Sequence, residues 1–342
     1  MITTPRTAPP QLGPKVTAVI PVHNNASTIL PLLDSLARQT IPPDEVVVVD
    51  DASKDETASL VLEHPLRVRL IRLEINSGPS MARNVGVEAA EGDVILFLDS
   101  DVEADPGCVA EVKSVFYDQS VDALNGMMHD QPLNNGWAVW YKCLVEHAWG
   151  DFMPQWDNTP NCLNARIGAI RRNMFLEVGG FDLRYKKPDV EDHHFGLCFT
   201  QTRRIVFDRN LKAFHHFSNF SQTAINYWKR TRSMLKLLWS FPHAKTDNSG
   251  ASQRSAFEFL TGTALLVSLP AAYWIGPWPA CVLLSCFLVM SHKSLRHCLR
   301  KKGPVFYAFA VALHAVYGAI VTCAGIYTLL EVKVLPRLKG GQ

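Results

Sequence analysis

This sequence has almost no excess of charge of either sign, no closely spaced cysteine pair and no apolar segment at its N-terminus. The 34 Lys and Arg residues stand against 32 Asp and Glu residues, which gives a net charge of +2 over 342 residues. This balance provides no basic excess for nucleic acid, so no nucleic-acid partner is expected. The eight cysteines form neither a C-x-x-C pair nor a dense framework. They are therefore interpreted as free thiols of a cytoplasmic or intramembrane protein.

The N-terminal segment, residues 1–15, is rich in Pro and Thr and lacks an apolar core. This composition predicts a disordered leader and not a signal peptide. The soluble part of the chain is therefore expected to stay in the cytosol.

Apolar residues are concentrated towards the C-terminus. Residues 259–291 carry no formal charge and are interrupted by a Gly-Pro-Trp-Pro segment. This run is too long for one span and predicts a hairpin, although its short second arm also suits a re-entrant segment. The basic loop at 293–302 is expected in the cytosol by the positive-inside rule. The sequence thus predicts a multi-pass region with spans over about 256–275, 277–291 and 304–330.

An apolar run at 94–98 ends abruptly in Asp99-Ser100-Asp101. A run this hydrophobic predicts a buried parallel strand. The carboxyl end of such a strand is where an open α/β sheet places its site. Two carboxylates there offer oxygen ligands to Mg²⁺ or Mn²⁺, which in turn would hold the diphosphate of a nucleotide.

Strands and helices alternate in the N-terminal part of the chain. Apolar runs predict strands over 16–22, 45–50, 67–73 and 94–98. Helices are predicted over 26–39, after a capping box of Ser53 and Glu56, and over 79–90. This alternation predicts an α/β fold with a doubly wound parallel sheet. The residues that follow each strand should meet at one edge of that sheet.

Four ordered motifs at these strand ends resemble family 2 glycosyltransferases with the GT-A (Rossmann-like) fold. They lie at 20–24, 48–57, 76–84 and 98–101. The resemblance implies a UDP- or GDP-linked sugar donor and a Mg²⁺ or Mn²⁺ cofactor. It implies that Pro21, His23, Asn24 and Asp51 contact the nucleobase. Arg83 would lie near the nucleotide, Asp99 would contact the ribose and the metal, and Asp101 would bind the metal.

Simpler interpretations exist for some of these residues. Asp51 could cap the helix that follows it, and Arg83 could be a solvated helix residue. Asn84 is expected to stabilise a turn or helix and not to touch substrate. The family often has tyrosine where His23 stands, and a histidine ring stacks less well.

The second half of the resemblance contains the expected base. Gly-Gly-Phe-Asp at 179–182 resembles the turn before the acceptor site, and Glu191-Asp192 resembles the Glu-Asp motif at a helix start. Inversion at an anomeric carbon requires a base that takes the proton from the attacking hydroxyl, and Asp192 is the expected base. Glu191 would orient the acceptor or the base; alternatively the pair only caps a helix. His215 resembles the histidine beside the metal, and a packed histidine at a strand end is the alternative.

Two further segments suggest contact with a membrane or an acceptor. Tryptophans are concentrated between 137 and 156, which suits a sugar-stacking cleft, a lipid-headgroup surface or ordinary core. These are Trp137, Trp140, Trp149 and Trp156. Residues 221–241 mix aromatic with basic residues and predict an amphipathic helix on an anionic membrane surface.

The expected organisation is a leader, a catalytic domain over 16–220, an interfacial helix and a transmembrane region over 256–330. The catalytic domain divides into a nucleotide-sugar half, 16–117, and an acceptor half, 118–220. The predicted function is metal-dependent, inverting sugar transfer to a hydroxyl of a membrane lipid or lipid-linked saccharide. The alternatives are a polyprenyl-phosphate glycosyltransferase, a processive polysaccharide synthase and a catalytically silent membrane scaffold.

Overall fold

The computed structural model describes residues 13–153, 161–241 and 253–333. The predictions for most of the leader and for Trp156 lie outside these residues. All eight cysteines are described and are free thiols, as expected.

The first four predicted strands form one side of the sheet as expected. They are β1 (Val16–Val22), β2 (Glu45–Asp50), β3 (Arg69–Arg72) and β4 (Val94–Leu98). The neighbouring pairs β2–β3, β1–β2 and β1–β4 are parallel. Every residue of β1 and β4 is buried, which explains why these strands are continuous apolar runs. The four carboxyl ends therefore face one edge of the sheet.

The rest of the sheet corrects the expectation of an all-parallel arrangement. The eight strands have the order β3-β2-β1-β4-β7-β6-β8-β5. The additional strands are β5 (Val102–Ala104), β6 (Ala123–Met128), β7 (Ile167–Arg171) and β8 (Ile205–His215). β7 runs antiparallel to both β4 and β6, so the sheet is mixed. An apolar run shows that a strand is buried but does not encode which way its neighbour runs.

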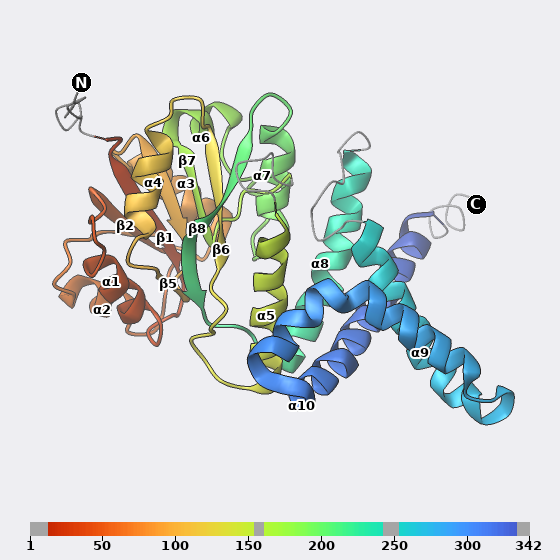
Figure 1. The fold of residues 1–342 in the computed structure, drawn as a ribbon. Helices are drawn as coiled ribbons and strands as arrows, with labels where there is room; N and C mark the ends of the chain where they lie inside the picture. The colour runs from red at the N-terminus through yellow and green to blue at the C-terminus, as the bar shows by residue number, and fades with distance from the viewer. Residues whose placement is uncertain (1–12, 154–160, 242–252, 334–342) are drawn as a thin grey trace, which may run out of the picture. The chain divides into compact units, whose positions relative to one another are not determined.

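Helices connect the strands, and the first three lie at nearly the predicted positions. They are α1 (Ile29–Ala37), α2 (Thr57–Glu63), α3 (Pro79–Ala89), α4 (Cys108–Phe116) and α6 (Arg172–Val178). α3 packs on β1 and β2, and α4 packs on β1 (Figure 1). The predicted capping box is wrong, because the N-cap of α2 is Glu56 and it makes no side-chain cap bond. Asp55 accepts instead from the backbone and hydroxyl of Thr57.

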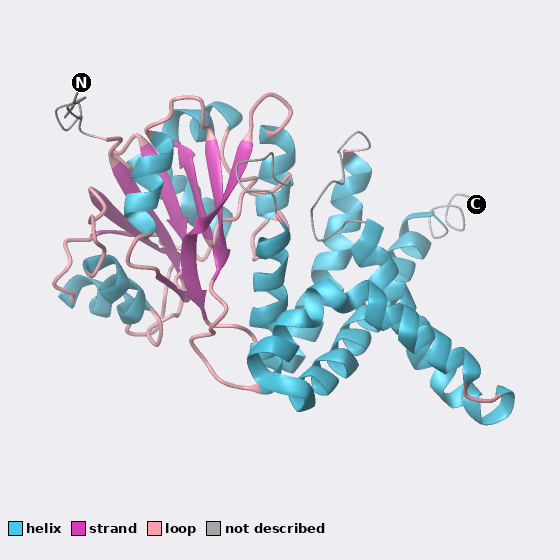
Figure 2. Ribbon diagram, viewed as in Figure 1, coloured by secondary structure: helices cyan, strands magenta, loops and turns pink. Residues whose placement is uncertain are grey.

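The remaining helices are α5 (Trp137–Phe152), α7 (Glu191–Phe199), α8 (Phe220–Ser240), α9 (Gln253–Ile275) and α10 (Trp278–Lys333). The described residues after β8 are organised as helices (Figure 2). α10 is interrupted at Gly303, whose φ of 79° is not helical. In the described residues, 256–274 and 278–332 are long and apolar enough to cross a membrane. That criterion rests on length and composition alone.

The chain divides into two compact units. The first contains the described residues up to Gly126, Asn164–Lys186 and Asn210–Lys212. The second contains Met127–Leu163, Lys187–Arg209 and the described residues from Ala213 onwards. The expected donor residues belong to the first unit, whereas Glu191, Asp192 and His215 belong to the second.

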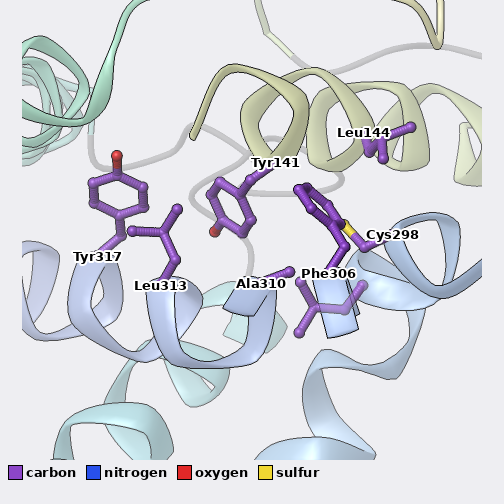
Figure 3. Packing of buried hydrophobic residues seen from close by; sticks show 8 residues of the cluster. Tyr141, Leu144, Cys298, Phe306, Ala310, Leu313 and Tyr317 are labelled. Atoms are coloured by element: carbon purple, nitrogen blue, oxygen red, sulfur yellow. The ribbon is translucent and has the colours of Figure 1, made fainter. Parts of the chain in front are cut away.

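An apolar cluster joins α5 to α10 within the second unit. Tyr141 and Leu144 of α5 meet Phe306, Ala310 and further α10 residues (Figure 3). Tyr141 also shares a hydrogen bond of 2.6 Å between its hydroxyl and Nδ1 of His314. His314 therefore forms a hydrogen bond between α5 and α10.

Candidate active site

The end of β1 carries His23 and Asn24 in a fixed hydrogen-bonded arrangement. Nδ1 of His23 lies 2.6 Å from the carbonyl oxygen of Asp51, and its Nε2 lies 2.8 Å from Nδ2 of Asn24. Asn24 Oδ1 accepts from the backbone of Lys54 at 2.8 Å, which sets the orientation of the amide. The ring therefore donates from Nδ1 and accepts at Nε2. Both side chains are oriented by contacts with the loop after β2.

The backbone is strained just after β1 and β2. Asn24 has a φ of 53° and Ala52 a φ of 57°, a region that L-residues seldom occupy. The side chain of alanine has no polar atom, so it cannot form a local hydrogen bond that would compensate for this conformation. Such strain at matching strand ends is typical of sites that hold a ligand. Pro21 is buried inside β1, aligned with Val49 of β2.

Asp51 ties the end of β2 to the loop that precedes α3. Its Oδ1 accepts from the backbone of Ser77 and its Oδ2 from the backbone of Gly78, both at 2.7 Å. The side chain is buried. Asp51 is therefore an anchor for this loop and not a cap for α2, so the helix-cap alternative is wrong.

Gly78 is required where this loop begins α3. Its φ of 91° and ψ of 167° fall in a region that is open essentially to glycine alone. A Cβ added there would lie 2.4 Å from the carbonyl oxygen of Lys186. Pro79 follows at the first helical position, where its missing N–H is harmless. The motif at 76–84 thus encodes a loop with one allowed backbone path.

Arg83 of α3 reaches the carboxylate that follows β4. Its Nη2 donates to Oδ1 of Asp99 at 2.7 Å, and its guanidinium lies 5.5 Å from the ring centroid of Phe181. The arginine side chain is 5% exposed and that of Asp99 is 25% exposed. Arg83 is therefore buried, and the interpretation as a solvated residue is wrong. Asp101, two residues after Asp99, is partly exposed.

Asn84 holds the Gly-Gly-Phe-Asp turn to α3. Its Oδ1 accepts from the backbone N–H of Phe181 at 2.9 Å, and its Nδ2 donates to the carbonyl of the same residue at 2.8 Å. A Cβ on Gly180 would meet Asn84 Oδ1 at 2.7 Å. The structure confirms that Asn84 stabilises a turn, and it brings Phe181 against Arg83.

In the second unit, α7 begins at the predicted acidic pair. Glu191 is 4% exposed, and its Oε2 accepts from the backbone of Asp189 at 2.8 Å. Asp192 is less buried, and its Oδ1 accepts from the backbone of His193 at 2.8 Å. Ligand atoms of Cys162, Asp192 and His193 lie within 4.8 Å of one another. Glu191 therefore fixes the loop before α7, whereas Asp192 stands at the more open position.

Burial lowers the pKa of His193, even though the carboxylate of Asp192 acts to raise it; Arg230 adds to the lowering. A buried imidazole loses the hydration that stabilises its charged form. The ring beside Asp192 is therefore held towards its neutral form.

His215 is the last residue of β8. Its ring packs edge-on against Phe217 with centroids 4.6 Å apart, and its carbonyl accepts from the backbone of Leu133 at 3.1 Å. This packing agrees with a histidine at a strand end and leaves its metal-binding role a prediction.

The described tryptophans of α5 do not form one cleft. Trp149 packs in the core with Phe207. Trp137 is 54% exposed and contacts aromatic residues of α10, and the ammonium of Lys302 lies 3.4 Å from the ring centroid of Trp140. Trp137 and Trp140 line a pocket of about 320 Å³ with Lys302. The ordinary-core interpretation therefore holds for Trp149 and in part for Trp140, which packs against the cluster between α5 and α10.

Sequence reasoning missed several contacts that shape the site. The amides of Ser77 and Gly78 that bind Asp51 are backbone groups, and residue identity gives no sign of them. Phe181 was assigned to a turn, yet it also lies against Arg83. Asp189 accepts from the hydroxyl of Ser233 on α8 at 2.6 Å. The glycines of the two loops were the only sequence signal for such close approach.

Residues 17–179 match the family model for Glycosyl transferase family 2. This part of the chain therefore carries a family 2 glycosyltransferase domain. An uncharacterized glycosyltransferase of Haemophilus influenzae is 29% identical over 190 residues, which are 54% of this chain and 61% of that protein. Succinoglycan biosynthesis protein ExoO of Rhizobium meliloti is 49% identical over 89 residues, 26% of each chain. These matches span less than two thirds of either relative.

The fold also matches a solved structure over most of the chain. The mannosyltransferase PcManGT from Pyrobaculum calidifontis, in complex with GDP-Man and Mn²⁺, has a TM-score of 0.56 at 19% identity. The match covers 92% of this chain and 88% of that one. At this identity the likeness shows the fold alone, and the mixed sheet is that of a GT-A glycosyltransferase.

Proposed function

We propose that this chain transfers a sugar, with inversion, from a UDP- or GDP-linked donor to a hydroxyl of a membrane lipid or lipid-linked saccharide. The observation that carries the donor assignment is the pair of carboxylates after β4, of which Asp99 is oriented by the buried Arg83 at 2.7 Å. Strained strand ends and an anchored loop surround this pair on the same edge of the sheet.

The donor-binding roles follow from which groups are fixed before a ligand arrives. Pro21, His23, Asn24 and Asp51 would contact the nucleobase. The hydrogen bonds of His23 and Asn24 support this role, because a preorganised site loses less entropy on binding. Arg83 would stay near the nucleotide and hold Asp99 towards the ribose.

A divalent cation suits the chemistry of the remaining donor-site groups. Arg83 occupies Oδ1 of Asp99, and the carboxylate of Asp101 adds further oxygen ligands of the kind that Mg²⁺ and Mn²⁺ prefer. His215 is proposed as an additional ligand. The Mn²⁺ in the PcManGT complex supports this choice by analogy of fold. When bound, the ion would neutralise negative charge on the departing diphosphate.

Asp192 would act as the general base. The acceptor oxygen would attack the anomeric carbon while the bond from that carbon to the diphosphate oxygen breaks. Asp192 would take the hydroxyl proton, and the nucleoside diphosphate would leave. Its position at the start of α7, less buried than Glu191, supports access to an acceptor. Glu191 would position the base by fixing the loop before it.

A membrane location is supported by the apolar surface of the C-terminal helices. On α9, Val267 is 70%, Tyr273 84% and Trp274 83% exposed. Exposed apolar area on this scale requires a lipid or protein environment. We propose that 256–330 forms about three spans and that the basic loop after 291 and the catalytic domain face the cytoplasm. The helix at 221–241 would lie at the interface.

The acceptor assignment separates this proposal from its alternatives. A polyprenyl phosphate is already an anionic nucleophile and needs no base, whereas a hydroxyl does. Glu191 and Asp192 at the start of α7 therefore favour a hydroxyl. The similarity to a succinoglycan biosynthesis protein supports a saccharide as the acceptor that carries this hydroxyl. A processive synthase and a silent scaffold remain outcomes of the test below.

The test uses the full chain purified in detergent with Mn²⁺ or Mg²⁺. A panel of UDP- and GDP-sugars is screened for release of nucleoside diphosphate, with and without a membrane lipid extract. We expect release that needs both metal and extract and that Asp101→Ala removes. Polymeric product would favour the processive synthase. No release, together with no thermal shift by any nucleotide, would favour the scaffold.

The base is tested separately with Asp192→Asn. We expect kcat to fall by about 10²–10⁴-fold while donor affinity stays nearly unchanged. Asp118→Asn, an exposed carboxylate in the loop after α4, is the matched control and should keep full activity. Turnover by Asp192→Asn at the level of the control would contradict the assignment.

A further inference from the structure

A group of three metal-ligating side chains lies between α5 and α10, apart from all residues used above. His147 and Asp151 are four positions apart on α5, so they share one face of the helix. His297 comes from α10. One ligand atom from each of the three residues lies within 4.8 Å of the other two. A single ion could therefore reach all three.

The orientation of His147 is set by a contact on its far side. Its Nδ1 lies 2.9 Å from the carbonyl oxygen of Met128 and therefore donates to it. The other nitrogen, Nε2, then carries a lone pair and lies 4.0 Å from Oδ1 of Asp151. A histidine that binds a metal generally donates its second ring N–H to such an oxygen.

His297 shows a contact that an ordinary ion pair does not explain. Its Nε2 lies 3.1 Å from Oδ2 of Asp151. This nitrogen is nevertheless buried and makes no hydrogen bond of acceptable geometry within the described part of the chain. A buried imidazole nitrogen without a hydrogen bond, next to a carboxylate oxygen, is available as a ligand for a metal ion.

The ligands stand on a rigid frame with an entry path. Leu144 of α5, three positions before His147, and Cys298 of α10, next to His297, belong to the packed cluster between the two helices (Figure 3). The side chain of Asp151 is 33% exposed, whereas the two histidines are 15% and 12% exposed. An ion could thus enter from the side of the carboxylate.

The chemistry of the three ligands selects the kind of ion. Two imidazoles and one carboxylate suit Zn²⁺ or a similar transition ion, whereas Mg²⁺ and Ca²⁺ prefer oxygen ligands throughout. Arg296 also faces the cluster, with Nη2 3.8 Å from Oδ2 of Asp151. Its side chain is 29% exposed, so it can turn towards solvent when an ion binds.

We propose that His147, Asp151 and His297 bind a divalent transition ion, with Zn²⁺ the best suited. The fourth coordination position would hold water, and the ion would fasten α5 to the turn of α10 before Gly303. This site shares no residue with the proposed donor site. Its existence is therefore independent of the proposed transferase reaction.

The experiment measures Co²⁺ and Zn²⁺ binding to the full chain in detergent after chelator treatment. Co²⁺ bound through histidine gives a visible absorption band, and elemental analysis gives the stoichiometry of Zn²⁺. We expect one equivalent of Zn²⁺ that remains in Asp101→Ala. We expect His147→Ala and His297→Ala to weaken Co²⁺ binding by at least about tenfold. His292→Ala, an exposed histidine of α10, should bind like the unaltered chain.

A second measurement guards against variants that fail to fold. Zn²⁺ should raise the thermal midpoint of the unaltered chain but not that of His297→Gln, and without metal both should retain the same circular dichroism spectrum. Binding that is equal in the unaltered chain and in the doubly substituted His147→Ala/His297→Ala chain would overturn the proposal. The cluster would then be an Asp–His ion pair only.

Discussion

Nη2 of Arg83 lies 2.7 Å from Oδ1 of Asp99, and the arginine is the more deeply buried partner. The guanidinium of Arg83 also lies over the ring of Phe181, which belongs to the Gly-Gly-Phe-Asp turn. The carboxylate that follows β4 is thus oriented from α3 and from a turn far along the chain. Its orientation is fixed by the fold before a donor binds.

Removing the guanidinium should disturb both the fold and the donor site. Arg83→Met leaves Asp99 without its charged partner, so we expect the free energy of unfolding to fall by about 1–3 kcal/mol. Donor affinity should fall as well, because Asp99 is no longer held in place. Arg83→Lys keeps the charge but not the planar guanidinium, so its stability and donor affinity should lie between those of the unaltered chain and Arg83→Met. Denaturant unfolding and nucleotide titration measure these effects; unchanged nucleotide affinity in Arg83→Met would contradict the coupling.

Asp51→Asn tests whether the loop before α3 depends on a carboxylate. An amide offers one acceptor where Asp51 provides two, for Ser77 and Gly78. One buried N–H loses its partner, and we expect a loss of about 1–3 kcal/mol in the free energy of unfolding. The nucleotide Kd should rise in the same variant. Ser59→Ala, a surface residue of α2, is the control and should change neither quantity.

Gly78 and Gly179 are two test positions with the same φ of 91°, but Gly78 has a ψ of 167° and Gly179 a ψ of 12°. A Cβ at Gly179 meets nothing within 4 Å, whereas one at Gly78 lies 2.4 Å from a backbone oxygen. Gly179→Ala should cost about 1–2 kcal/mol for the backbone conformation alone. Gly78→Ala should cost more and also weaken nucleotide binding. Equal losses in thermal unfolding and equal affinities would show that neither the extended ψ of Gly78 nor its close approach to Lys186 matters.

The stability of the second unit should depend on pH through His193. Burial lowers the folded-state pKa of His193, while an unfolded histidine titrates near about 6.5. The unfolded chain therefore binds more protons below this value, and stability present above about pH 6.5 is lost as the pH falls through the folded pKa. His193→Asn should reduce this slope. The thermal midpoints of the two chains, measured from about pH 7.5 to about pH 5.5, test this expectation. An unchanged slope in His193→Asn would contradict it.

The sequence by itself predicted the elements that depend on local burial. β1, β2 and β4 have the predicted bounds, and α3 ends within a residue of its predicted end. Continuous apolar runs mark strands that are buried on both faces, and this signal does not need the rest of the chain. The motifs at the strand ends predicted the family 2 glycosyltransferase domain for the same reason: each lies within a short stretch.

Only the tertiary structure decided which distant residues meet. The antiparallel direction of β7 and the bonds between Asn84 and Phe181, 97 positions apart, have no local signal. Arg83 became a buried residue because Asp99 and Phe181 enclose it. His147 and His297 likewise meet only because α5 packs on α10. Periodicity reports whether a residue is buried, whereas the partner it meets there is fixed by the packing of the whole chain.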